Sequence, residues 1–105
     1  MSELVHLTIE DGLATITLDS PANRNALSRQ LTTELATQFD RAIADSNARI
    51  ILLTATGPVF CSGADLKEQR EANETGGKTG PAALAPILEA MWNAPKPVVG
   101  RINGA

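Results

Sequence analysis

The sequence predicts an α/β fold that contains a parallel pair of strands. Two short apolar runs rich in strand-forming residues, 50–53 and 98–102, are typical of strands covered on both faces in a parallel sheet. Helical patterns lie between these runs, and strands joined through helices form a parallel pair by a right-handed crossover. An alternating apolar pattern near the N-terminus adds an antiparallel hairpin ahead of them.

The hairpin is predicted over residues 4–19, where a two-residue turn interrupts two alternating segments. The turn is Asp11-Gly12, a dipeptide favoured in tight hairpins because both positions can adopt positive φ. The apolar positions are Val5, Leu7 and Ile9 before the turn, and Ala14, Ile16 and Leu18 after it. We therefore expect a hairpin with one buried face.

An amphipathic helix is predicted from Ser28, a good N-cap residue, to about Asp45. Its apolar stripe recurs at helical spacing and consists of Leu31, Leu35, Phe39, Ala42 and Ile43. Its opposite face carries Arg29, Glu34, Gln38 and Arg41, which we expect to form a solvated surface.

The second half of the chain predicts two more helices around a polar loop. A short helix is expected from about residue 64 to 72, followed by a glycine-rich stretch, 73–80, that we interpret as a mobile loop. Pro81 suits the first turn of the next helix. The apolar face of this helix contains Leu84, Ile87, Leu88, Met91 and Trp92.

Composition excludes several classes of function. The 105 residues suffice for one small domain, and a net charge of -3 gives no electrostatic reason to bind nucleic acid or an anionic membrane. An aromatic content of 3% leaves few stacking platforms for single-stranded nucleic acid. One cysteine excludes an internal disulfide and a multi-cysteine zinc site. With no signal-peptide pattern and no long apolar run, we expect a cytoplasmic protein. The sequence also indicates no metal or redox cofactor.

Several residues suggest chemistry on their own but have simpler structural interpretations. The stretch GGKT, 76–79, has Ala72 where a phosphate-binding loop needs a glycine, so a solvated loop is the better interpretation. His6 stands alone on the polar side of the first strand and predicts a surface histidine. Cys61 has no partner in the sequence and predicts a small buried thiol.

The carboxylates after residue 63 are ambiguous. Asp65 and Glu68 share a helix face and could form an acid–base pair, but carboxylates are also favoured in a first helical turn by the helix dipole. The step Gly63-Ala64 carries a different signal, because a strand, a tight loop and a helix start follow one another there. Such a point leaves backbone N–H groups unpaired, and these donors can stabilise an oxyanion.

The segment FCSGADLKE, 60–68, resembles the oxyanion-loop signature of the crotonase, or enoyl-CoA hydratase/isomerase, superfamily. Three further segments resemble that family in the same order: NRNALS (23–28), RIILLTATGPVFCSG (49–63) and KPVVGRINGA (96–105). The resemblance covers nearly the whole chain. It implies a crotonase-like (ClpP/crotonase) spiral of strand-strand-helix units, incomplete in this chain, with residues 1–105 as the N-terminal part of a single domain.

The resemblance also implies a site. The Ala64 backbone N–H would be one of two donors that bind the oxygen of a thioester enolate, with most of its effect in the transition state. Arg24 either approaches a phosphate of coenzyme A or faces solvent. The residues that match the family's substrate and coenzyme A site are Arg24, Ala26, Leu27, Ser62, Gly63, Ala64, Asp65, Leu66 and Lys67.

The family's second donor and its catalytic glutamates lie beyond the segment that matches residues 96–105. We therefore expect an enoyl-CoA hydratase-type enzyme of fatty-acid or branched-chain metabolism whose 105-residue chain is inactive alone. The alternatives are an enoyl-CoA isomerase and a truncated, non-catalytic paralogue that binds coenzyme A. The implied partner is an acyl-CoA thioester, the implied assembly of full-length members is a homotrimer or hexamer, and the open parallel edge predicts a marginal fold.

Overall fold

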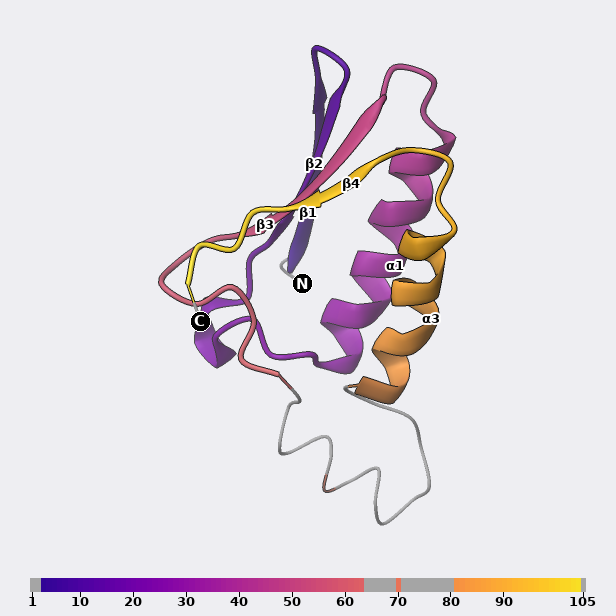
Figure 1. Ribbon diagram of the computed structural model, residues 1–105. Coiled ribbons are helices and arrows are strands. Elements are labelled where there is room, and N and C mark those ends of the chain that lie inside the picture. The colour runs from indigo at the N-terminus through magenta and orange to yellow at the C-terminus, as the bar shows by residue number, and fades with distance from the viewer. Residues whose placement is uncertain (1–2, 64–69, 71–80, 105) are drawn as a thin grey trace.

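The computed structural model describes residues 3–63, 70 and 81–104, with backbone alone for 81–83. The elements are β1 (Val5–Glu10), β2 (Leu13–Leu18), the short 3₁₀ helix η1 (Pro21–Asn23), α1 (Arg29–Ala44), β3 (Ile50–Ala55), α3 (Pro81–Trp92) and β4 (Val98–Gly100). They form one mixed sheet in the order β1-β2-β3-β4, with both helices on one side (Figure 1). The predicted loop 73–80 and, apart from residue 70, the predicted helix 64–72 lie outside the described residues.

The sheet confirms the α/β class and the predicted hairpin. β1 and β2 are antiparallel, with Val5 opposite Leu18 and Glu10 opposite Leu13, and the turn residues Asp11 and Gly12 have φ of 53° and 84°. β3 pairs in parallel with β2 on one side and with β4 on the other. The predicted parallel pair, β3 with β4, is therefore confirmed, although β4 ends at Gly100 and is shorter than the apolar run 98–102.

Helix α1 begins and ends with polar contacts to its exposed backbone groups. The Leu31 N–H donates to Ser28 Oγ over 3.1 Å, which confirms the predicted N-cap. At the other end, Lys96 Nζ donates to the carbonyl oxygens of Ala42 and Asp45 over 2.9 and 2.8 Å. The apolar stripe of α1 packs against β1 and β2, and four of its five members are buried: Leu31, Leu35, Phe39 and Ala42.

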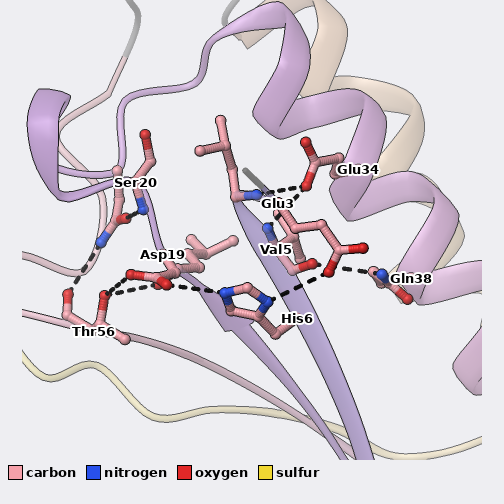
Figure 2. A network of polar contacts seen from close by, with 11 residues as sticks. Glu3, Val5, His6, Asp19, Ser20, Glu34, Gln38 and Thr56 are labelled. Carbon is pink, nitrogen blue, oxygen red and sulfur yellow. Dashed lines mark hydrogen bonds and ion pairs between the residues drawn. The ribbon is translucent and has the colours of Figure 1, made fainter. Parts of the chain in front are cut away.

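The prediction of a solvated opposite face on α1 is wrong for Glu34 and Gln38. Glu34 Oε1 accepts hydrogen bonds from the N–H groups of Leu4 and Val5 over 2.7 and 3.1 Å, and Gln38 Nε2 lies 3.5 Å from the Val5 carbonyl oxygen (Figure 2). Both side chains are half-buried, whereas Arg29 and Arg41 are exposed as predicted. The reason is that α1 crosses the start of β1, which is the edge strand of the described sheet and has no strand on its outer side there to satisfy its backbone.

The prediction that both apolar strands are covered on two faces is also wrong within the described residues. Ile51 is fully buried beneath the helices, but Ile50 and Val99 are 42% and 49% exposed. Leu13, which lies beside Ile50, is 37% exposed. Successive strand residues point to opposite faces, so Leu13, Ile50 and Val99 mark the side on which the structure describes no helix. We call this side the bare face.

Helix α3 packs mainly against α1 and buries a narrower stripe than predicted. Ile87 is buried and Leu84 and Met91 are half-buried, whereas Leu88 and Trp92 are 52% and 90% exposed. Within the described residues α1 is the helix that packs on α3, and one helix covers only part of an apolar face, so the outer half of the predicted stripe is exposed there. Within the described part of the chain, no helix is both long and apolar enough to cross a bilayer.

Candidate functional site

The candidate site lies where the parallel strands β2 and β3 end at the same edge of the sheet. A turn, residues 19–28, follows β2, and a loop, residues 56–63, follows β3. Two backbone hydrogen bonds join them: the Leu27 N–H donates to the Gly63 carbonyl oxygen over 2.7 Å, and the Ser62 N–H to that of Arg24 over 3.1 Å. The structure thus brings together five predicted site residues from two distant segments: Arg24, Ala26, Leu27, Ser62 and Gly63.

The turn after β2 folds tightly because two consecutive residues adopt the left-handed conformation. Arg24 and Asn25 have φ of 56° and 57°, which is uncommon for residues other than glycine. This conformation exposes Arg24 and directs Asn25 inward. Ala26 and Leu27 are also buried, so their side chains belong to the core, and it is mainly their backbone that a ligand could contact.

Asn25 is a site residue that sequence reasoning missed. It is 1% exposed, and its side-chain oxygen accepts a hydrogen bond from the Ser20 N–H over 2.7 Å. Its amide nitrogen donates to the carbonyl oxygens of Val59 and Thr56 over 2.9 and 3.3 Å. Nothing in the sequence distinguishes Asn25 from the neighbouring Asn23, because two of its three partners lie more than 30 residues away.

A small hollow of about 160 Å³ lies between the turn and the loop. Its lining consists of Pro21, Arg24 and Asn25 on one side and residues 56–59 on the other. The exposed Arg24 gives this hollow a positive charge that suits an anionic group.

A larger hollow of about 770 Å³ lies at the opposite end of the sheet, beside the hairpin turn. It is lined by three carboxylates, Glu10, Asp11 and Asp45, and by one guanidinium, that of Arg49. This excess of negative charge disfavours a polyphosphate ligand, so the smaller hollow is the better candidate despite its size.

Gly63 confirms the predicted sharp turn at the end of the loop. Its φ of 97° is a backbone conformation that residues with a side chain rarely adopt, although open space surrounds the position that a Cβ atom would take. Ala64, Asp65, Leu66 and Lys67 follow directly and lie outside the described residues. Their predicted roles therefore stay predictions.

The segment that follows β4 also approaches this loop, as Figure 1 shows for the yellow C-terminal end of the chain. Asn103 Nδ2 donates to the Gly57 carbonyl oxygen over 2.6 Å. A Cβ atom on Gly104 would overlap the carbonyl oxygen of Pro58, so the two backbones touch without space for a side chain. The loop 56–59 is thus enclosed between the turn after β2 and the segment after β4.

His6 is not the isolated surface histidine that the sequence predicted. Its Nε2 lies 2.9 Å from Asp19 Oδ2, and its Nδ1 lies 3.7 Å from Glu3 Oε2 (Figure 2). Thr56 Oγ1 donates to Asp19 Oδ1 over 2.9 Å. The hydrogen bonds from His6 and Thr56 hold the pKa of Asp19 below its ordinary value. The error arose because the strand pattern places His6 on a face but does not show that Asp19 lies across the hairpin.

Cys61 is half-buried against the core, less enclosed than the buried thiol that was predicted. Among the residues that the structure describes, no three His, Cys, Asp or Glu side chains lie close enough together to hold a metal ion.

Comparison with known proteins identifies the family of this site. The Enoyl-CoA hydratase/isomerase family profile matches residues 8–105. A probable enoyl-CoA hydratase of Mycobacterium bovis is 42% identical over 101 residues, which are 96% of this chain and 39% of that protein. The 1,2-epoxyphenylacetyl-CoA isomerase of Escherichia coli is 30% identical over 109 residues, or 99% of this chain and 41% of the isomerase.

A solved structure of a related protein has a similar fold. The human enoyl Coenzyme A hydratase domain-containing protein 3 superimposes with a TM-score of 0.82 and 27% identity, covering 96% of this chain and 40% of the human chain. The chain thus spans about 40% of the length of these relatives and contains part of a crotonase-like fold. With a family profile that matches nearly every residue and a superimposable fold, the chain belongs to the enoyl-CoA hydratase/isomerase family.

Proposed function

We propose that this chain forms part of the acyl-CoA site of an enoyl-CoA hydratase-type enzyme and supplies one backbone donor, the Ala64 N–H, to the thioester oxygen. The observation that carries the proposal is the joining of residues 23–27 to residues 62–63, directly before Ala64, in a member of this family. The enzyme would act in fatty-acid or branched-chain acyl-CoA metabolism in the cytoplasm, without a cofactor other than the coenzyme A of its substrate.

The chemistry of the proposed donor is electrostatic. When a thioester reacts through an enolate, negative charge accumulates on its carbonyl oxygen, and a fixed N–H group stabilises that charge. Loss of one such donor typically slows an enzyme by ~10²–10³. The positive φ of Gly63 supports this role, because it turns the chain sharply just before residue 64.

The remaining predicted residues would bind the coenzyme A part of the substrate. Arg24 lies exposed on the rim of the 160 Å³ hollow, where its guanidinium can pair with a phosphate. Asp65, Leu66 and Lys67 would line the same ligand, together with Ser62 and the backbone of residues 26–27.

We also propose that the 105-residue chain alone has no hydratase turnover. The resemblance places the second donor and the catalytic glutamates beyond the segment that matches residues 96–105. Full-length enzymes of this type would assemble as a homotrimer or hexamer.

Nuclear magnetic resonance of the nitrogen-15-labelled chain tests the proposed site. We expect crotonyl-CoA, but not free coenzyme A, to move the Ala64 amide proton downfield, because only the thioester brings a carbonyl to that donor. Arg24→Ala should weaken the binding of both ligands about equally. Arg41→Ala serves as the matched control, because Arg41 is an exposed arginine on α1. An Ala64 amide that responds equally to both ligands, or to neither, would refute the proposal.

An isomerase is the second candidate, favoured by the 30% identity to the Escherichia coli 1,2-epoxyphenylacetyl-CoA isomerase. A hydratase incorporates solvent oxygen into its product, whereas an isomerase does not. Assay of the complete protein in oxygen-18 water therefore separates the two activities by the mass of the product. Binding of crotonyl-CoA without any product would instead indicate a non-catalytic coenzyme A-binding protein.

A further inference from the structure

We propose that Asn25 and Asn103 are positioning residues that fix the loop 56–63 and thereby the orientation of Gly63. We call this pair the asparagine clamp. The inference rests on the proposed function, because the residue that Gly63 presents is the proposed oxyanion donor, Ala64.

The clamp is built from side-chain amides that bind backbone carbonyl groups of the loop. Asn25 Nδ2 donates to the carbonyl oxygens of Thr56 and Val59, and Asn103 Nδ2 donates to that of Gly57. Residues 56–58 are exposed, and Gly57 has a positive φ of 77°. An exposed Gly-Pro loop beyond the end of a strand is ordinarily among the least restrained parts of a fold. Here three of its carbonyl groups are bound to asparagine side chains.

The two asparagines contact the loop from segments that follow β2 and β4, the two strands that flank β3 in the sheet. Asn25 belongs to the turn after β2 and uses both amide protons and its oxygen in hydrogen bonds, so its rotamer is fixed. Asn103 follows β4, and the adjoining Gly104 packs directly on the Pro58 carbonyl oxygen. A shift of the loop away from either segment would therefore break at least one of these contacts.

The far end of the loop is bound to the same turn that carries Asn25. The Leu27 N–H donates to the Gly63 carbonyl oxygen, and the Ser62 N–H donates to that of Arg24. Asn25 and its neighbours thus bind residues 56, 59, 62 and 63, which leaves the loop little freedom between β3 and Gly63. An N–H donor acts as an oxyanion donor only when it is held in place before the reaction, since reorientation during the reaction would cost part of the stabilisation.

The contacts that Asn103 makes have a second consequence. By the resemblance to the family, the other donor follows the segment that contains Asn103 and Gly104. Their contacts with Gly57 and Pro58 would then set the distance between the two donors, because they bind one segment to the other.

Asn103→Asp tests the clamp, since it retains the shape of the side chain but removes the amide protons. Asn103 is exposed, so folding should survive the change. Asn47→Asp is the matched control, because Asn47 is an exposed asparagine before β3, at the opposite end of the sheet. Both variants are compared with the wild-type chain by infrared spectroscopy of bound crotonyl-CoA labelled with carbon-13 at the thioester carbonyl.

We expect the bound carbonyl band of the wild-type chain and of Asn47→Asp to lie at lower frequency than that of free crotonyl-CoA, because a donor polarises the bond. In Asn103→Asp the frequency of the bound carbonyl band should return most of the way to that of free crotonyl-CoA. Crotonyl-CoA should bind roughly three- to tenfold more weakly, as for loss of one hydrogen bond, whereas free coenzyme A should bind unchanged. A merely structural role would lower the melting temperature and leave the band frequency unaltered, and that result would overturn the clamp.

Hydrogen exchange without ligand separates failure of the clamp from failure of the proposed function. The amide protons of residues 60–62 should exchange faster in Asn103→Asp than in Asn47→Asp. Faster exchange supports the clamp even if the wild-type chain leaves the thioester band unshifted, an outcome that refutes the proposed function alone. Equal exchange in the two variants refutes the clamp, whatever the ligand shows.

Discussion

The two faces of the sheet carry similar apolar residues, but the most buried and the most exposed of these residues lie on opposite faces. On the face beneath α1, Ala14, Ile16 and Ile51 are fully buried, whereas Leu13, Ile50 and Val99 on the bare face are 37–49% exposed. The comparison teaches that an apolar strand pattern shows which residues can be buried but does not show what covers them. No described element covers the bare face, and the chain spans about 40% of its relatives' length.

The largest expected effect comes from the covered face. Phe39→Ala removes a side chain of α1 that is 1% exposed in the hydrophobic core, and we expect a loss of about 3–5 kcal/mol in the free energy of unfolding. Urea unfolding followed by circular dichroism measures this loss, with Phe39→Leu as the milder control. A loss below about 1 kcal/mol would show that this face is not the stabilising core.

Lys96 should have the next largest effect. Lys96→Met retains most of the apolar stem but removes the ammonium group that binds the carbonyl oxygens of Ala42 and Asp45 at the C-terminus of α1. We expect a loss of about 1–2 kcal/mol in the free energy of unfolding, because these carbonyls lose a charged donor at the negative end of a helix dipole. Lys96→Arg should restore part of this loss. Equal stability of Lys96→Met and the wild-type chain would contradict the assignment.

The ionisation of Glu34 should make the free energy of unfolding depend on pH. Burial raises the pKa of its carboxyl, but hydrogen bonds from Gln30 and from the Leu4 and Val5 N–H groups, with the charge of His6, outweigh burial and leave the pKa below its ordinary value of 4.5. A carboxyl whose pKa is lowered by folding stabilises the protein above its unfolded pKa, and this contribution disappears as the pH falls through the folded pKa.

The matched variant for this dependence is Glu34→Gln, which retains an acceptor but has no charge. At pH 7 we expect its free energy of unfolding to be about 1 kcal/mol lower than that of the wild-type chain. The difference between the two should shrink as the pH falls below 4.5. A difference that stays constant from pH 7 to pH 3 would mean that the ionised form of Glu34 adds nothing to stability.

The smallest effect on stability belongs to the bare face. Ile50→Thr should change the free energy of unfolding by no more than about 0.5 kcal/mol, since the side chain is already 42% exposed. The same change should reduce self-association, because exposed apolar patches and open sheet edges favour contacts between copies. Analytical ultracentrifugation measures this, and a large loss of stability with unchanged association would mean that something does cover this face.

Local sequence patterns predicted the parts of the fold that depend on neighbouring residues. The Asp11-Gly12 turn, the Ser28 cap and the apolar stripe of α1 all follow from residues close together in the chain. The pairing of β3 with β4 was also predictable, because only a parallel arrangement suits two apolar runs joined through helices.

The contacts that were missed join side chains to distant backbone groups. Glu34 binds N–H groups 29 and 30 residues away, Lys96 binds a carbonyl oxygen 54 residues away, and Asn103 binds one 46 residues away. No periodicity encodes such partners, because they are set by how the elements pack. The adjacency of Arg24 to Ser62 was expected only from the resemblance to the family, and local physics pointed no further than the Gly63-Ala64 step.

The role of the Ala64 N–H can be tested by removing that single proton. Incorporation of L-lactic acid at position 64 replaces the amide with an ester and keeps the methyl side chain. We predict that carbon-13-labelled crotonyl-CoA bound to the wild-type chain has its carbonyl band at lower frequency than free crotonyl-CoA, and that the ester variant binds free coenzyme A equally well but loses this displacement. An identical carbonyl band in the two proteins would contradict the assignment of Ala64 as the oxyanion donor.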